Sequence, residues 1–268
     1  MKEMSFEETK QVELEILTNV ADFCDKNSIT YYLAYGTLIG AVRHKGFIPW
    51  DDDIDIWMPR ADYNKFIQIY GQQNPEQRYK VISPEDKISR HTFAKVIDTK
   101  TVKIEANIDY SNGYLGVDID IFPLDGQPDN DKEYLKWYNK LQKHYKLFPF
   151  LIYSKPNSLV KKIAFPILRF LSGGKNNILE KTAKLHKNYS YEESLYVGAI
   201  ECCYDLINNR YKKEWFSDFE VVDFEGKKFK IPIGHDEILT QIYGDYMQLP
   251  PVEMRVTHHS NSTYWLEN

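Results

Sequence analysis

Cysteine is rare in this chain of 268 residues, which holds only Cys24 and the adjacent pair Cys202-Cys203. Three thiols so placed are too few and too poorly spaced for a disulfide framework or a zinc site. Long apolar runs are missing as well: none approaches the roughly 18 residues of a membrane-spanning helix. Residues 1–5 lack the apolar core of a secretory signal. We therefore expect a protein of a reducing, cytoplasmic compartment, with its thiols buried or partly buried.

Internal repeats and low-complexity linkers are also missing. The composition, with 43% hydrophobic and 27% charged residues, is ordinary for a soluble globular protein. The length allows one large domain or two small ones, and it is enough to bury a substantial core.

Acidic residues are absent from one long segment. Between Glu133 and Glu180 the chain has nine lysines and arginines and no aspartate or glutamate. Apolar residues recur at helical spacing over 137–148 and 159–170. Such a segment fits contact with an anionic membrane surface or a lipid-linked acceptor, and it equally fits a helical subdomain with solvated lysines. We expect no nucleic-acid partner, because the whole chain is acidic and no binding module accompanies the lysines.

The remaining chain mixes helical and strand patterns, which predicts an α/β fold. Ser5-Phe6-Glu7-Glu8 is a capping box, so we expect a helix to about Asn27. A hairpin that turns at Glu225-Gly226 and a short helix after it are also expected. The other predicted strands cover 29–34, 79–82, 92–97 and 115–122. One predicted helix starts at 38 and a second covers 59–70. The short helix after the hairpin covers 235–243.

Four acids fall within five positions in Asp51-Asp52-Asp53-Ile54-Asp55, after a Gly36-Thr37 turn and the basic triplet Arg43-His44-Lys45. Two carboxylates about 4 Å apart repel each other by about 1 kcal/mol in water and about 4 kcal/mol at a protein surface. A folded chain relieves such repulsion with a cation or a shared proton. The cluster therefore predicts a divalent-metal site, and the triplet beside it a phosphate clamp.

The alternation in Asp53-Ile54-Asp55-Ile56 predicts a half-buried strand. Asp53 and Asp55 would then share one face, and Asp51 would join them if the strand extends back past Pro49. Magnesium prefers oxygen ligands, typically one or two carboxylates with phosphates and waters. We therefore expect Mg²⁺ or Mn²⁺ at this strand.

Other interpretations of the motif compete. An EF-hand loop also begins Asp-x-Asp-x-Asp, but it needs glycine and glutamate where this chain has Ile56 and Asp62. A solvated acidic turn would bind no ligand. A nucleotide-sugar glycosyltransferase, which clamps its diphosphate through a metal on an Asp-x-Asp motif, is the serious competitor.

The runs 36–44 and 47–55 together resemble the signature of the LicD family. Four later stretches agree with it in order: Val117–Asp125, Phe229–Gly234, Tyr243–Tyr246 and Pro250-Pro251 through Arg255 to His258-His259. LicD proteins are phosphotransferases of the nucleotidyltransferase superfamily, related to fukutin and fukutin-related protein. The resemblance implies a mixed sheet flanked by helices, with a catalytic core over 1–130, a basic helical insert over 131–190, and a C-terminal part over 191–268 that completes the core.

The resemblance also implies roles for five acids. Asp53 and Asp55 would be the carboxylate pair of one strand, with Asp51 adjoining, and Asp120 the third acid on a neighbouring strand. All four would contribute to the metal site. Asp118 is the alternative to Asp120, because both alternate with apolar residues and share a strand face. The family order of acid, apolar residue, aromatic and proline favours Asp120.

Donor-phosphate contacts are expected from the Gly36-Thr37 turn, since a helix beginning there offers backbone N–H groups to phosphate. Arg43 and His44 are further candidates, Arg43 being the best because its guanidinium fork suits phosphate oxygens. Lys95, on a predicted strand, is either a second clamp or a surface lysine. Three later residues are possible phosphate or acceptor contacts: Arg255, His258 and His259.

The reaction implied by the resemblance is transfer of phosphocholine from CDP-choline to a hydroxyl of a lipid-linked teichoic-acid or lipopolysaccharide precursor, with release of CMP. Asp120 would serve a second metal or act as the general base. Transfer of ribitol or glycerol phosphate, the glycosyltransferase reaction, and a catalytically inactive binding module are the alternatives. Choline needs an aromatic cage, which twenty tyrosines and five tryptophans permit without locating it.

Overall fold

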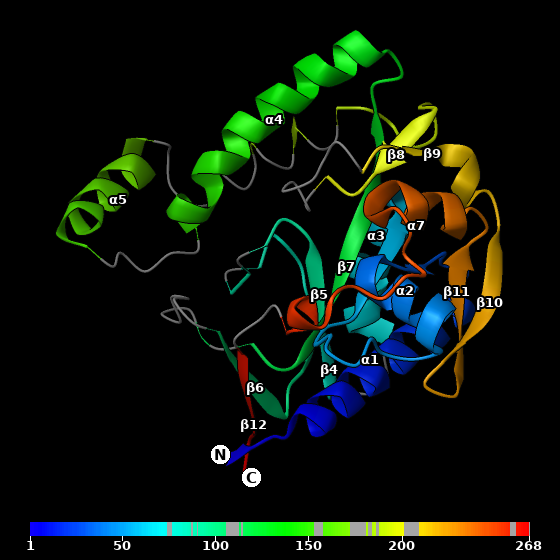
Figure 1. The fold of residues 1–268 in the computed structure, drawn as a ribbon. Coiled ribbons are helices and arrows are strands. Elements are labelled where there is room, and N and C mark those ends of the chain that lie inside the picture. The colour runs from blue at the N-terminus through cyan, green and yellow to red at the C-terminus, as the bar shows by residue number, and fades with distance from the viewer. Residues whose placement is uncertain are drawn as a thin grey trace.

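Seven strands form the central sheet of the computed structural model (Figure 1). Five follow the order β2 (Tyr32–Leu33), β3 (Asp55–Pro59), β7 (Asp118–Gln127), β5 (Ala94–Asp98) and β4 (Tyr79–Ile82). Strand β8 (Tyr196–Gly198) pairs with the end of β7, and β9 (Tyr211–Lys212) pairs with β8. Strands β3 and β7 run parallel, whereas β5 runs antiparallel to β7. Together with the helices, this mixed sheet confirms the predicted α/β class.

The structure describes residues 1–73, 77–86, 88–89, 91–105, 113, 115–152, 158–171, 181, 184–185, 188–200, 209–257 and 261–267. The cysteines at 202–203 and the histidines at 258–259, on which sequence predictions were made, lie outside these residues. Cys24, by contrast, is fully buried in the core.

Helix α1 (Phe6–Lys26) begins as predicted with a capping box, in which Ser5 and Glu8 cap each other's backbone N–H groups. Its apolar stripe of Val12, Ile16 and Val20 is buried in the main core. After β2 come the short helix α2 (Tyr35–Ile39) and one π-helical turn, η1 (Gly40–His44). Helix α3 (Arg60–Gln73) follows β3 directly. The helices predicted in these regions are therefore present.

The predicted hairpin is also confirmed. Strands β10 (Phe219–Phe224) and β11 (Lys227–Pro232) pair around Glu225 and Gly226, which both have positive φ angles. Helix α7 (His235–Tyr243) has the predicted bounds. Two 3₁₀ turns, η3 (Lys213–Phe216) and η4 (Val252–Met254), flank this region.

A second sheet, not predicted, joins the two ends of the described chain. Strand β12 (Asn261–Trp265) pairs with β1 (Lys2–Glu3) on one side and β6 (Thr101–Glu105) on the other. The N- and C-terminal ends accordingly lie side by side in Figure 1. A two-residue strand and the mostly polar run Asn-Ser-Thr in β12 carry too little alternation to predict a strand.

Several predicted strand boundaries were wrong. The strand expected over 29–34 is only Tyr32–Leu33, and the one expected to end at 122 continues to Gln127. Strand β3 begins at Asp55 rather than Asp53, and the residues after Ile56 are buried without alternation. The reason is the central place of β3 between β2 and β7, where both faces are covered. Asp51, Asp52 and Asp53 therefore lie in a loop before the strand.

Two helices extend away from the sheet: α4 (Asp131–Ile152) and α5 (Leu159–Leu171) (Figure 1). Tyr134, Trp137 and Leu141 of α4 form a small core with Ile200. The guanidinium of Arg210 holds the start of α4, because it stacks 4.5 Å from the Tyr134 ring and pairs with Asp131 at 2.7 Å. Among the described residues, no helix combines the length and apolar character needed to cross a bilayer.

Candidate active site

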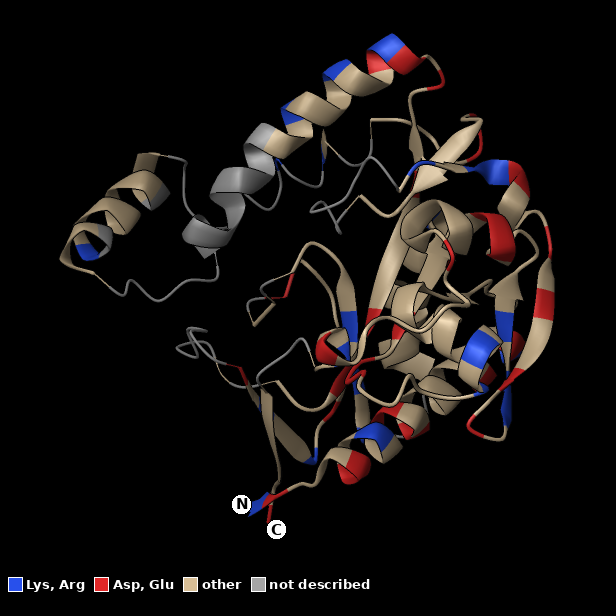
Figure 2. Cartoon of the chain, in the orientation of Figure 1, with Lys and Arg blue, Asp and Glu red and all other residues tan. Residues whose placement is uncertain are grey.

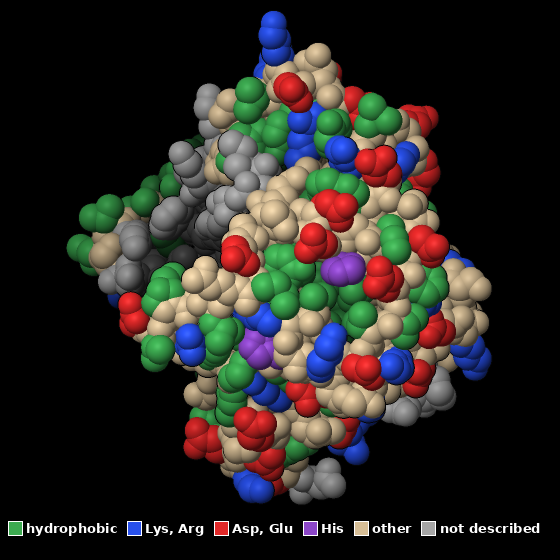
Figure 3. All heavy atoms as spheres, turned by 45° about the vertical axis from the view of Figure 1, so that its right-hand side comes forward, with side chains coloured by type: hydrophobic (Ala, Val, Ile, Leu, Met, Phe, Trp, Pro, Cys, Tyr) green, Lys and Arg blue, Asp and Glu red, His purple; other side chains and the backbone are tan. Residues whose placement is uncertain are grey.

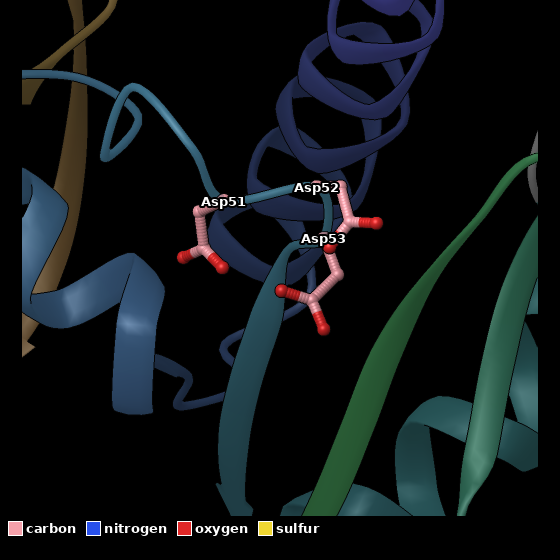
Figure 4. Close-up of side chains that lie close together, drawn as sticks. All are labelled: Asp51, Asp52 and Asp53. Atoms are coloured by element: carbon pink, nitrogen blue, oxygen red, sulfur yellow. The ribbon is translucent and has the colours of Figure 1, made fainter. Parts of the chain in front are cut away.

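Three consecutive carboxylates gather in the loop that leads into β3. Asp51, Asp52 and Asp53 each offer one carboxylate oxygen, and these oxygens lie within 4.8 Å of one another (Figure 4). All three residues are partly exposed. Oxygen donors in this arrangement suit Mg²⁺ or Mn²⁺. Asp52, to which the sequence analysis assigned no role, thus belongs to the same cluster.

Gly36 and Thr37 lie inside α2, which begins at Tyr35 rather than after a separate turn, and they pack against this loop. A Cβ atom at position 36 would lie 2.5 Å from Oδ2 of Asp51, so only glycine leaves room for that carboxylate. The buried hydroxyl of Thr37 accepts a 2.9 Å hydrogen bond from the backbone N–H of Asp55. Glycine and threonine therefore fix the start of α2 to the acidic loop and to the start of β3.

Asp55, Asp120 and Lys95 form a row across three adjacent strands. In the register of the sheet, Asp120 of β7 is the partner of Asp55 on β3 and of Lys95 on β5. The backbone N–H of Asp120 also donates to the carbonyl of Ile54 at 2.9 Å. Two of the acids that the resemblance assigned to one site are thus neighbours, although 65 positions separate them in the chain.

Two buried lysines give Asp118 and Asp120 different surroundings. The Lys95 ammonium donates hydrogen bonds to both carboxylates. Lys103 of β6 pairs with the other oxygen of Asp118 at 2.9 Å. The side chain of Asp118 is only 2% exposed, against 19% for Asp120. Asp118 is therefore enclosed between two cations, whereas Asp120 is the more accessible acid and lies beside Asp55.

The same contacts separate the pKa values of these acids. Burial disfavours ionisation of Asp118, but Lys103 and Lys95 outweigh it and lower its pKa. Burial, opposed by Lys95 and reinforced by Asp118, raises the pKa of Asp120 to about 6. Burial followed by Asp53, Asp120 and Asp51 raises the pKa of Asp55 well above its usual range. The negative charge around Asp55 is therefore in excess, which is the condition that a divalent cation relieves.

Lys95 is buried and is not the surface lysine that was one of its two expected roles. Its side chain is 8% exposed, and its ammonium group pairs with Asp118 and Asp120. These carboxylates raise the pKa of Lys95 despite burial, which alone would lower it. The cross-strand register that places Lys95 opposite Asp120 is the physical reason. Here it acts as a counter-ion within the acidic site.

Glu13 and Lys103 are site neighbours that the sequence analysis did not identify. Glu13 of α1 is 1% exposed, and its carboxylate oxygens have no hydrogen-bond partner among the described residues. Burial raises its pKa; Lys103 opposes that shift, while Asp53, Asp118 and Asp52 add to it. Glu13 thus lies behind the acidic loop. The unusual sequence signal was an acid within the apolar stripe of an amphipathic helix.

Basic side chains lie near Trp50, next to the acidic loop. Arg255 lies 5.5 Å from the ring of Trp50, the residue before Asp51, and the His44 ring is 6.3 Å from the same tryptophan. Arg43 donates from Nη1 to the carbonyls of Tyr246 and Gln248, and from Nε to Nδ1 of His44 at 3.3 Å. Burial and then Arg255 lower the pKa of Arg43. Two arginines more than 200 positions apart are thus close enough to repel each other, as in an anion site.

Aromatic rings continue the strand faces that carry the acids and Lys95. Phe122 stands two residues after Asp120, and Phe93 two residues before Lys95; their ring centroids are 4.4 Å apart. Tyr35, the residue before Gly36, packs against Phe122 at 5.6 Å. The Lys95 ammonium is 5.6 Å from the centre of the Phe93 ring. Tyr35 and Phe93 remain partly exposed, so aromatic surface adjoins the acidic site.

This mixed sheet, with acids on neighbouring strands and Gly36 and Thr37 in the helix beside them, is the arrangement that the family resemblance implied. Residues 28–153 match the family model "LicD/FKTN/FKRP, nucleotidyltransferase domain". The chain is also 34% identical to the lipopolysaccharide cholinephosphotransferase LicD of Haemophilus influenzae, over 276 aligned positions that cover 99% of this chain and all of that protein. The chain therefore belongs to the LicD family and is a phosphotransferase, as the sequence motifs predicted.

Another relative matches only part of the chain. An uncharacterized protein of Rickettsia typhi is 40% identical over 73 residues, which cover 27% of this chain and 24% of that protein. A match of this length indicates that one segment is related, and it supports no statement about function.

Proposed function

We propose that this protein transfers phosphocholine from CDP-choline to a hydroxyl group of a lipopolysaccharide-type glycan precursor, with a divalent cation as cofactor. The observation that carries the proposal is the acidic cluster of Asp51, Asp52 and Asp53 beside the neighbouring acids Asp55 and Asp120. The cholinephosphotransferase activity in the name of the Haemophilus influenzae relative supports the donor group and the acceptor class. A teichoic-acid precursor is an acceptor of the same kind.

The residues present fit Mg²⁺ or Mn²⁺. All candidate ligands are carboxylate oxygens, and the raised pKa of Asp55 indicates that burial and the neighbouring acids outweigh the charge of Lys95. Asp51, Asp53 and Asp55 would hold the ion, with Asp52 and Asp120 within the same acidic group. When bound, the ion would neutralise charge on the diphosphate of the donor.

Asp120 is our candidate for the general base. One oxygen accepts the Lys95 hydrogen bond, which orients the carboxylate, and a pKa of about 6 leaves it ionised at neutral pH yet basic enough to accept a proton. The acceptor hydroxyl would give its proton to Asp120 while its oxygen bonds to the phosphorus that bears choline. The bond from that phosphorus to the bridging oxygen would break, and CMP would leave.

Donor recognition would fall to the groups on either side of the acids. Arg43 and Arg255, which meet near Trp50, would contact the diphosphate or the acceptor. The half-buried rings of Tyr35 and Phe93 would contact the trimethylammonium group, since aromatic faces attract quaternary ammonium ions. Lys95 already places one cation near the Phe93 ring. This aromatic surface favours choline over ribitol or glycerol, which have no positive charge.

Release of the donor's nucleotide, which is CMP from a CDP-alcohol and UDP from UDP-glucose, tests the proposal across a panel of donors. We would supply CDP-choline, CDP-ribitol, CDP-glycerol or UDP-glucose with Mg²⁺ and a lipopolysaccharide precursor, and follow thermal stability in parallel. A ligand at 100 times its dissociation constant adds about 2.7 kcal/mol of stability. We expect turnover and a magnesium-dependent shift with CDP-choline. Turnover with UDP-glucose alone would instead make the protein a glycosyltransferase, and turnover with another CDP-alcohol alone would change the head group.

A matched pair of variants ties that activity to the site. Asp55→Asn removes a central carboxylate, whereas Asp223→Asn removes one that is exposed on the β10–β11 hairpin and pairs only with Lys228 among the interactions seen there. Activity lost in the first variant and kept in the second supports the site. Equal activity in both would refute it.

A further inference from the structure

Helix α5 exposes nearly all of its large apolar side chains. Six of them are between 53% and 84% exposed: Leu159, Val160, Ile163, Ile167, Phe170 and Leu171. Exposed aliphatic residues scattered singly are normal on a protein surface, but a contiguous group marks an interaction site.

The six residues form one face. At 100° per residue, which follows from 3.6 residues per turn, they occupy an arc of about 120° on the helix. Phe165, which is 6% exposed, lies outside this arc. The helix contacts α4 and otherwise stands away from the main sheet, and green apolar atoms gather at this projecting end in Figure 3. The arc therefore faces away from the core of the protein.

The chain segment that contains α5 carries charge of one sign. Lys162 is exposed on the helix, and the chain from 134 to 179 carries nine positive charges and no acid. In Figure 2 the described part of α5 has no acidic position, while acidic positions are frequent on the body of the protein. An apolar arc within a cationic segment is complementary to a surface that is apolar below and anionic above.

We propose that α5 docks on the surface of an anionic phospholipid bilayer, with its six exposed apolar residues in the headgroup–acyl boundary. A helix of 13 residues is about 20 Å long at 1.5 Å per residue, which is too short to span a bilayer but sufficient to lie in its plane. The exposed face and the charge of α5 support lipid binding whatever reaction the protein catalyses. Its use, to bring the acidic site to a lipid-linked acceptor, rests on the proposed function.

A second copy of the chain is the other partner that could cover the apolar arc. Two copies that meet through α5 would bring two acid-free cationic segments together, and like charges oppose that contact. An anionic bilayer satisfies both the apolar arc and the charge. The surface of the membrane is therefore the partner that the observations favour.

Vesicle flotation of the full chain tests the proposal without any substrate, so its outcome is independent of the donor and acceptor. We would compare vesicles of phosphatidylglycerol with phosphatidylcholine against vesicles of phosphatidylcholine alone. The test variant is Ile163→Glu/Ile167→Glu. The control is Val221→Glu/Val252→Glu, which places the same charges at exposed apolar positions outside α5. Circular dichroism and the melting temperature confirm that both variants fold.

We expect the wild type and the control to float with anionic vesicles and the α5 variant to lose at least 10-fold in partitioning. Lys162→Glu should lower binding in the same direction, by a smaller factor. No flotation of the wild type, equal binding of the folded α5 variant, or equal binding to neutral vesicles would overturn the proposal. So would light scattering that shows a dimer of the wild type and a monomer of the α5 variant without any vesicle binding.

Discussion

The side chain of Asp51 occupies the space that a side chain on Gly36 would need. A Cβ atom at position 36 would lie 2.5 Å from Oδ2 of Asp51 and 3.4 Å from its Cγ. The glycine is within α2, where alanine is otherwise the better residue. Glycine at position 36 therefore leaves room for the Asp51 carboxylate, and the helix itself does not require it.

Gly36→Ala should displace Asp51 while the fold survives. We expect magnesium affinity to fall about 10-fold or more, as when a residue that orients a metal ligand is lost. Stability should change by no more than about 1 kcal/mol, because alanine favours the helix while the carboxylate rotates away. Titration calorimetry and urea unfolding measure the two quantities.

Gly71→Ala is the matched control, since glycine 71 is in α3 and its Cβ would meet nothing closer than Val81 at 3.9 Å. This variant should keep full magnesium affinity. If Gly36→Ala binds magnesium as tightly as the control does, Asp51 is not a ligand.

Asp55→Asn should abolish turnover and stabilise the metal-free protein. Electrostatic stabilisation by one such group is worth on the order of 10²–10³ in rate. Stability without metal should rise, because the charge that burial, Asp53 and Asp120 disfavour is removed. The melting temperature in EDTA tests the second effect; a lower value than that of the wild type would contradict the proposed repulsion.

The stability of the metal-free protein should depend on pH through Asp120. Its folded pKa of about 6 lies above the unfolded value of about 3.9. The folded state therefore holds more protons, and the contribution is complete below about pH 4 and lost as pH rises through about 6. Asp55 acts in the same direction, and Asp118, with its lowered pKa, acts only below about pH 4.

Urea midpoints in EDTA between pH 4.5 and 7.5 would measure this loss, which should be smaller in Asp120→Asn. Magnesium must displace the bound protons, so its affinity should increase over the same range. A magnesium affinity that is flat from pH 5 to 7.5 would show that these acids do not bind the ion.

Lys95→Met should be strongly destabilising, because it leaves two carboxylates in a buried place with one fewer cation. Loss of one partner from a buried ion pair costs about 3–5 kcal/mol. Lys95→Met/Asp120→Asn should recover part of this loss, because it removes the carboxylate whose pairing with Lys95 is lost, while Asp118 keeps its pairing with Lys103. Urea unfolding of the single and double variants measures the coupling.

Lys228→Met breaks an exposed pair with Asp223 at 2.9 Å and should cost less than about 1 kcal/mol. A cost for Lys95→Met no greater than that of Lys228→Met would mean that the lysine is not the counter-ion of the site.

Phe93→Leu should weaken binding of the choline group selectively. A cation–π contact is worth about 0.5–2 kcal/mol, which corresponds to a rise in KM for CDP-choline of about 2- to 30-fold. KM for CDP-glycerol should not change, and Phe219→Leu, at an exposed position of β10, should leave both values as they are. A parallel rise for both donors in Phe93→Leu would indicate a packing defect.

Much of this protein is determined by short stretches of sequence. The capping box of α1, the Glu225-Gly226 hairpin turn and α7 each depend on residues within a few positions of one another, and each has the predicted place. The acidic loop is of the same kind, since Asp51, Asp52 and Asp53 are adjacent in the chain before the chain folds. Capping, turn geometry and local charge repulsion act over this range, so the sequence is enough to predict them.

Only the tertiary structure determined which acid is buried between two lysines and which lies beside Asp55. Asp118 and Asp120 have the same strand pattern. The register of β3, β7 and β5 sets Asp120 beside Asp55, whereas Lys95 of β5 and Lys103 of β6 enclose Asp118. The meeting of Arg43 with Arg255 and the exposure of the apolar face of α5 were equally outside sequence reasoning. Register depends on pairing between distant segments, and burial depends on what packs around a residue. Neither quantity is a property of any local run of amino acids.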